Sequence, residues 1–154
     1  MNQVKHLFGV LIFTCLVSAQ ALDVNTLANL LVKASYFNKI KSDKFVIVYG
    51  SSEEGRAKKL NKLVGGKAVE ISSVQKSIDY QNVIFIGLTP DEIASVKGNY
   101  KKVLTISDDP KNIEVVSLAF GIKDNGRPLI LVNLTLAKNE ADFKSQFLKI
   151  AQVK

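Results

Sequence analysis

Short, continuous apolar runs alternate along this chain with segments of helical spacing. Residues 44–49 read KFVIVY and residues 82–87 read NVIFIG, and neither run has a polar residue in its interior. Strands that are apolar at every position are typical of parallel sheets covered by helices on both faces. Helical spacing of apolar residues recurs over 24–40 and 52–64. The sequence therefore predicts a single α/β domain with a mixed, mostly parallel sheet and helices on both faces.

The remaining segments complete this architecture. Further strands are predicted at 67–71, 102–106, 115–122 and 128–133, a connection at 72–81, and helices from 90 to about 98 and over 134–150. Thr89 and Pro90, followed by two acidic residues, form a strong helix start. Asn125 and Gly126 form a typical hairpin turn. The domain is thus expected to end in a C-terminal β-hairpin followed by a helix.

The N-terminus has the pattern of a cleavable signal peptide. One cation, Lys5, precedes an uncharged apolar run over 7–17, which is too short to span a bilayer. Small residues then flank Gln20, as at a signal peptidase site. We expect residues 1–21 to be removed and residues 22–154 to form a mature domain in the periplasm, with no transmembrane segment.

Cleavage would also remove the two residues of the chain whose side chains are most often used in catalysis. The only histidine, His6, and the only cysteine, Cys15, both lie in the segment that is removed. The mature chain then has no imidazole for acid–base chemistry and no thiolate for nucleophilic attack or metal binding. Loss of Lys5 lowers the net charge from +7 to +6, a balance that favours an acidic partner or anionic head groups. We predict that the protein is not an enzyme, has no cofactor or metal, and does not bind nucleic acid.

Ligands of open α/β sheets bind beyond the carboxyl ends of the strands. The loops expected there are polar and rich in glycine, and they could present backbone N–H groups to an anion or a polar metabolite. The candidate ligand-binding residues are Gly50, Ser51, Ser52, Gly87, Thr89, Ser107 and Asp108. Ordinary turns have a similar composition, so both interpretations stay open.

Two short motifs come close to known catalytic or nucleotide-binding patterns. Residues 50–57 have the glycine spacing of a phosphate-binding loop, but Arg56 and Ala57 stand where that loop needs lysine and then serine or threonine. Ser73 and Lys76 match the Ser-x-x-Lys pattern of serine acyltransferases, whose partner motifs are absent from the chain. Neither motif therefore predicts an activity.

The order and spacing of segments over about 31–154 resemble those of the YfiR-like (YfiR/HmsC) periplasmic proteins. The similar segments are 31–40 (LVKASYFNKI), 46–50 (VIVYG), 82–87 (NVIFIG), 103–108 (VLTISD), the hairpin through Gly126, 132–134 (VNL) and 147–153 (FLKIAQV). Many members of that family carry disulfide-forming cysteines, which the mature chain lacks, so redox control is not expected here.

The resemblance implies a regulator without catalytic activity. It would bind the periplasmic part of an inner-membrane diguanylate cyclase of the YfiN type and hold that enzyme inactive, limiting cyclic di-GMP signalling and biofilm formation. One alternative function stays open at this point, the binding of a small anion or polar metabolite at the strand-end loops. With either function the protein could also form a homodimer.

The cleavage site gives a direct prediction. The mature protein should begin at Leu22, because small residues flank Gln20 at the end of the apolar run. Intact-mass spectrometry of the protein isolated from its own cells measures this. Recovery of a stable product that still carries residues 1–21 would contradict the prediction.

Overall fold

The computed structural model describes residues 21–39, 44–74, 82–100 and 103–154. The predicted signal peptide lies outside these residues except for Ala21, so its cleavage stays a prediction. Leu22, the expected first mature residue, is described, and its side chain is buried in the core.

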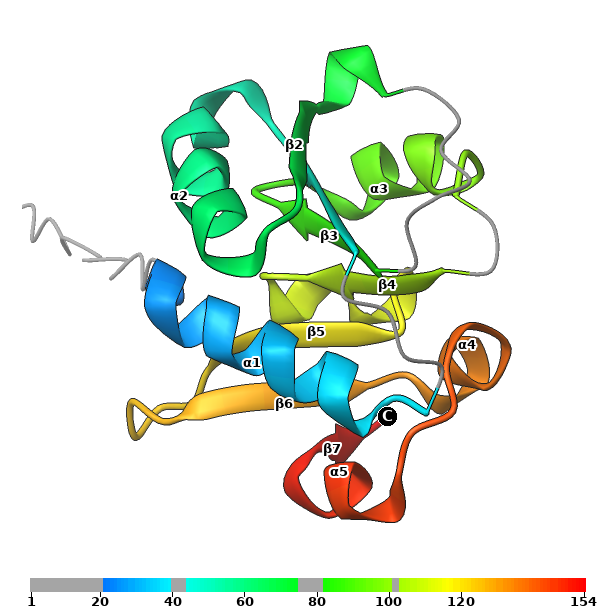
Figure 1. Ribbon diagram of the computed structural model, residues 1–154. Helices are drawn as coiled ribbons and strands as arrows, with labels where there is room; N and C mark the ends of the chain where they lie inside the picture. The colour runs from blue at the N-terminus through cyan, green and yellow to red at the C-terminus, as the bar shows by residue number, and fades with distance from the viewer. Residues whose placement is uncertain (1–20, 40–43, 75–81, 101–102) are drawn as a thin grey trace, which may run out of the picture.

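A single seven-stranded sheet runs through the molecule (Figure 1). Its strands are β1 (Phe45–Tyr49), β2 (Lys67–Glu70), β3 (Asn82–Ile86), β4 (Leu104–Ser107), β5 (Leu118–Ile122), β6 (Pro128–Val132) and β7 (Gln152–Val153). They lie in the order β2-β1-β3-β4-β5-β6-β7. The first five strands are parallel to one another, β6 is antiparallel to β5, and β7 is parallel to β6. The predicted mixed, mostly parallel sheet with a hairpin is confirmed.

Helices cover both faces of this sheet (Figure 1). They are α1 (Val24–Phe37), α2 (Glu54–Val64), α3 (Pro90–Lys97), α4 (Leu134–Glu140) and α5 (Ser145–Ile150), with a 3-10 helix η3 at Pro110–Glu114. Buried residues of α1, α2, α4 and α5 form one apolar cluster with the sheet, whereas α3 and η3 contribute to a cluster on the opposite face. The single α/β domain predicted from the sequence is therefore correct.

The central strands show why both faces need cover. In β1, Phe45, Ile47 and Tyr49 join the cluster under α1 and α2. The alternate residues Val46 and Val48 join the cluster on the α3 side. Side chains of a strand point alternately to the two faces, so an all-apolar strand must be buried on both.

The helix predicted over 134–150 is wrong as a single element, because the chain forms two helices, α4 and α5. Between them Ala141 is extended, and the segment that follows pairs with the end of α1. The Lys144 N–H donates to the Phe37 carbonyl at 2.9 Å, and the Lys39 N–H donates to the Asp142 carbonyl at 2.8 Å. These long-range backbone bonds replace the helical ones, and neither Gly nor Pro marks the break in the sequence.

Several other boundaries differ from the predictions. The strand expected from residue 115 begins at Leu118, because residues 110–114 form η3 and 115–117 form a turn. The helix expected over 24–40 ends at Phe37, and Ser51–Glu53 is a 3-10 turn, η1, ahead of α2. Strand β2 ends at Glu70, where a short 3-10 turn follows at Ile71–Ser73. The final strand β7 was not predicted. Residues 75–81 of the expected connection and residue 102 of the expected strand lie outside the described residues.

Within the described ranges, no helix combines the length and the apolar character needed to cross a membrane.

Candidate functional site

Three of the predicted site residues meet at one edge of the sheet, where parallel strands end side by side. Gly50 follows β1, Gly87 follows β3, and Asp108 follows β4. The Gly50 N–H donates to the Ile86 carbonyl and the Asp108 N–H donates to the Phe85 carbonyl, both at 3.3 Å. The loops thus continue the alignment of the strands that precede them.

An ion pair occupies the space between these loops. The Arg56 guanidinium reaches from α2 to the Asp108 carboxylate, whose side chain is only 5% exposed. The other Asp108 oxygen accepts a hydrogen bond from the Gly87 N–H at 3.2 Å. Arg56 also donates to the Leu22 carbonyl at 2.8 Å and lies 3.7 Å from the Glu53 carboxylate. We call Glu53, Arg56, Gly87 and Asp108 the strand-end cluster.

The glycine at the centre of this cluster is needed for packing as well as for conformation. Gly87 has a φ of +62°, which favours glycine, and a Cβ added there would lie 2.4 Å from the Glu53 Cγ. Glu53 therefore packs directly over the loop backbone. The polar groups that a bound anion would use are engaged with one another.

The other predicted site residues have structural partners or lie apart. The buried Ser107 hydroxyl accepts hydrogen bonds from the Asn112 side chain at 2.8 Å and the Asp109 N–H at 3.2 Å. Thr89 caps α3 through a reciprocal pair of bonds with Glu92. Ser51 and Ser52 are exposed in the 3-10 turn η1.

The charge state of Asp108 reflects two opposing effects. Burial raises the pKa of Asp108 above its ordinary 3.8, while the Arg56 charge and the Gly87 N–H oppose that shift. Because its pKa is higher in the folded state than in the unfolded chain, the folded state binds this proton more tightly. The Asp108 contribution to the free energy of unfolding consequently falls as pH rises from 3.8 through the folded-state pKa.

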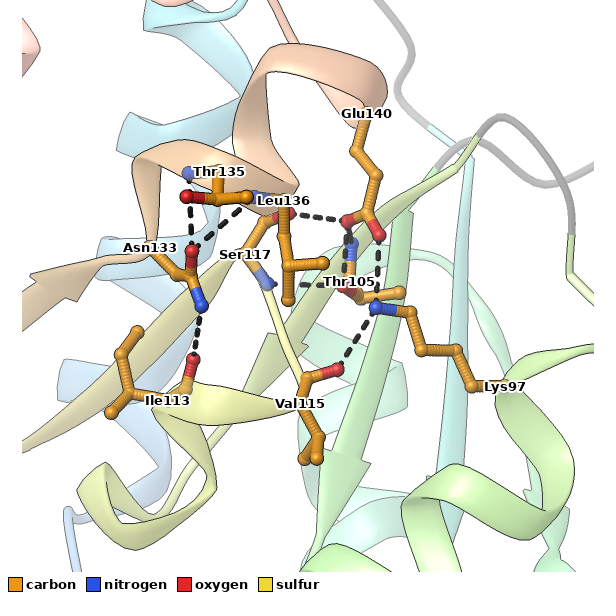
Figure 2. A network of polar contacts seen from close by, with 9 residues as sticks. All are labelled: Lys97, Thr105, Ile113, Val115, Ser117, Asn133, Thr135, Leu136 and Glu140. Carbon is orange, nitrogen blue, oxygen red and sulfur yellow. Dashed lines mark hydrogen bonds and ion pairs between the residues drawn. The ribbon is translucent and has the colours of Figure 1, made fainter. Parts of the chain in front are cut away.

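A second polar cluster, which the sequence did not reveal, lies near the amino ends of β4 and β5. Figure 2 shows the Glu140 carboxylate among donors from three other parts of the chain. It accepts hydrogen bonds from the Thr105 N–H at 2.9 Å, the Thr105 hydroxyl at 2.6 Å and the Ser117 hydroxyl at 2.5 Å. The Lys97 ammonium lies 3.1 Å away and also donates to the Val115 carbonyl at 2.9 Å. We call Lys97, Thr105, Ser117 and Glu140 the Glu140 network.

This network joins α3, β4, the residue before β5 and α4. The neighbouring Asn133 caps α4 through the N–H groups of Thr135 and Leu136, and its amide nitrogen donates to the Ile113 carbonyl (Figure 2). Glu140 supplies an acceptor for the Thr105 N–H near the start of β4, where ladder pairing with β5 has not yet begun. The arrangement fixes the last part of the chain against the sheet, which is a structural role.

An open cavity of about 550 Å³ lies beside Lys97, and its other lining includes Tyr100, Val115 and Leu136. Its surface is largely apolar, and Lys97, one of its two charged lining residues, is already held by Glu140 and a backbone carbonyl. In the part of the chain that the structure describes, no three His, Cys, Asp or Glu residues gather where they could hold a metal ion.

Comparison with known proteins adds evidence on the fold alone. No protein-family model matches the chain, and no curated protein matches it either. A similar solved structure is that of a conserved domain protein from Vibrio cholerae O1 biovar El Tor, with a TM-score of 0.60 and 12% sequence identity. The match covers 82% of this chain and 60% of that one. At this identity the similarity shows a shared fold.

The strand-end cluster predicts a large effect of Arg56→Met. Removing the cation leaves a buried carboxylate without its partner, so the free energy of unfolding should fall by about 3 kcal/mol. The pKa of Asp108 should rise further, because the opposing charge is gone. Urea unfolding and carboxyl-carbon NMR titration measure the two effects. The double variant Arg56→Met/Asp108→Asn should recover part of the stability, and an unchanged pKa in the single variant would contradict the assignment.

The Glu140 network gives a separate prediction. Glu140→Ala should lower the free energy of unfolding by about 3 kcal/mol, since it leaves Lys97 unpaired and the Thr105 and Ser117 donors without their acceptor. Thr135→Ala, an exposed change on the same helix, is the matched control. Equal stability of the two variants in urea unfolding would show that the network does not hold α4 in place.

Proposed function

We propose that this protein is a periplasmic regulator that binds the periplasmic part of an inner-membrane diguanylate cyclase and holds it inactive, so limiting cyclic di-GMP and biofilm formation. The partner and the compartment rest on the resemblance to YfiR-like proteins and on the signal-peptide pattern. The observation that carries the binding role is the exposed apolar stripe on α1, formed by Val32 and Tyr36.

These two side chains are exposed although the opposite face of α1 is packed. Val32 is 54% exposed and Tyr36 is 65% exposed. They are four residues apart and so lie one above the other on the helix surface. Leu27 and Leu31, on the other face, are fully buried against the sheet. The apolar stripe is therefore surplus to what the fold itself requires.

Tyr36 is partly held in position by its neighbours. Its ring meets the Phe37 ring edge to face at 5.3 Å, and the Lys144 ammonium lies 4.7 Å from its centre. Tyrosine is enriched in protein interfaces because it offers a large contact area with few rotatable bonds. A positioned, exposed tyrosine supports a protein partner.

The alternative, a small ligand at the strand-end loops, has less support. Arg56, Asp108 and the Gly87 N–H bind one another, so an anion would have to displace a buried ion pair. The mature sequence expected after cleavage contains no histidine and no cysteine, which favours a binding role over catalysis.

The proposal predicts that Val32→Asp/Tyr36→Ala abolishes regulation. The charge and the lost ring should weaken partner binding by at least tenfold, since truncation of a central interface residue costs 1–2 kcal/mol or more. Cells producing this variant should then have the raised cyclic di-GMP and surface attachment expected of a deletion strain. Asn139→Asp, which adds the same charge at an exposed position on α4, is the control and should regulate normally.

Affinity capture from membranes decides between the alternatives. A tagged wild-type protein should enrich a membrane-bound diguanylate cyclase, and the double variant should not. If deletion of the gene leaves cyclic di-GMP unchanged and no membrane protein is enriched, the regulatory role is wrong. If regulation persists in the double variant, α1 is not the binding surface.

A further inference from the structure

The outward face of α2 is rich in lysine. Lys58, Lys59 and Lys62 are exposed on this helix, and Leu63 beside them is 52% exposed. At 100° per residue these four side chains span about 140° of the helix surface, opposite the buried Ala57 and Leu60. The face therefore combines cations with one exposed apolar side chain.

Little negative charge lies on this side of the molecule. Glu54 is the only acidic residue of α2, and it pairs with Lys58 at 2.5 Å. Helix α1 contains no acidic residue, and Asp23 ahead of it caps its first turn. Within the described residues, Lys59, Lys62 and the exposed Lys33 of α1 form no ion pair.

Helices α1 and α2 belong to one layer. They contact each other and cover the same face of the sheet, side by side (Figure 1). Of the five exposed large hydrophobic side chains in the described ranges, three lie on these two helices, namely Val32, Tyr36 and Leu63. The lysines of α2, Lys33 of α1 and three of these five exposed hydrophobic side chains therefore lie in one helical layer.

We infer that the outward face of α2, with Lys59, Lys62 and Leu63 and supported by Lys33, binds anionic phospholipid head groups at a membrane surface. Protein interfaces are depleted in lysine and enriched in aromatic residues and arginine. The outward face of α2 carries lysines but no aromatic residue and no arginine. Long lysine side chains can instead place their ammonium groups among lipid phosphates while their stems lie along apolar surface. A leucine between them can enter the boundary between head groups and acyl chains.

The expected strength is modest. A lysine near an anionic membrane contributes about a fivefold gain in binding, so three give a gain on the order of 100-fold over a neutral surface. Such binding weakens as salt screens the charges. It would keep the protein near a membrane and would not anchor it there.

Vesicle sedimentation with the whole mature protein tests this inference. The wild-type protein should bind vesicles of phosphatidylglycerol and phosphatidylethanolamine on the order of 100-fold more tightly than vesicles of phosphatidylcholine, and salt should weaken the binding. Lys59→Gln/Lys62→Gln should lose about 25-fold of this affinity. The control Lys111→Gln/Lys123→Gln removes the same charge from exposed positions on other elements and should lose less than about threefold.

Three outcomes would overturn the inference. Equal binding to anionic and neutral vesicles would exclude a lipid surface, and an equal loss in both variants would show that only net charge matters. If the α2 variant binds vesicles normally but no longer captures its membrane partner, the lysines contact an acidic protein instead. The vesicles contain no protein, so this test is independent of the proposed regulation. Circular dichroism of both variants confirms that they are folded.

Discussion

Burial of the central strands on both faces is the constraint on which the rest of this structure depends. Every residue of β1 and β3 is buried, so neither face of the sheet can be left to solvent. Helices α1, α2, α4 and α5 cover one face of the sheet, and α3 and η3 cover the other. Among the described residues, the surfaces considered for function are therefore the outward faces of these helices and the loops at the strand ends.

The strand-end loops and the helix faces differ in how far their polar groups are already engaged. In the loops, Arg56 neutralises Asp108 and binds the Leu22 carbonyl, and Glu53 packs over Gly87. An open crevice of this fold usually receives a ligand at this place. Here a side chain of the protein fills it. The outward faces of α1 and α2 carry exposed apolar side chains and, within the described residues, three lysines that form no ion pair, namely Lys33, Lys59 and Lys62. These faces are therefore better suited to binding than the loops.

The architecture could be predicted from the sequence because, in each central segment, the spacing of apolar residues and the residue types indicate the same kind of element. The runs around Val46 and Ile84 have no polar interruption, and Thr89 with Pro90 marks a helix start that the structure confirms. The break at Ala141 could not be predicted, since it depends on backbone bonds to α1 more than 100 residues away. The sequence predicted that Gly50, Gly87 and Asp108 follow strands, but the strand order that brings their loops together is known only from the structure. The Arg56–Asp108 pair and the Glu140 network could not be predicted either, because spacing in a sequence carries no information on which distant side chains meet.

Arg56 also connects the two parts of the proposed binding layer. Its guanidinium holds the segment before α1 through Leu22 and the end of β4 through Asp108, while its backbone belongs to α2. Buried residues Leu27 and Leu60 fix the two helices to the same core cluster. A surface held in this way loses little conformational entropy on binding, so more of its contact energy is available for affinity. The ion pair that fills the crevice therefore also favours the pre-organisation of the α1 and α2 faces.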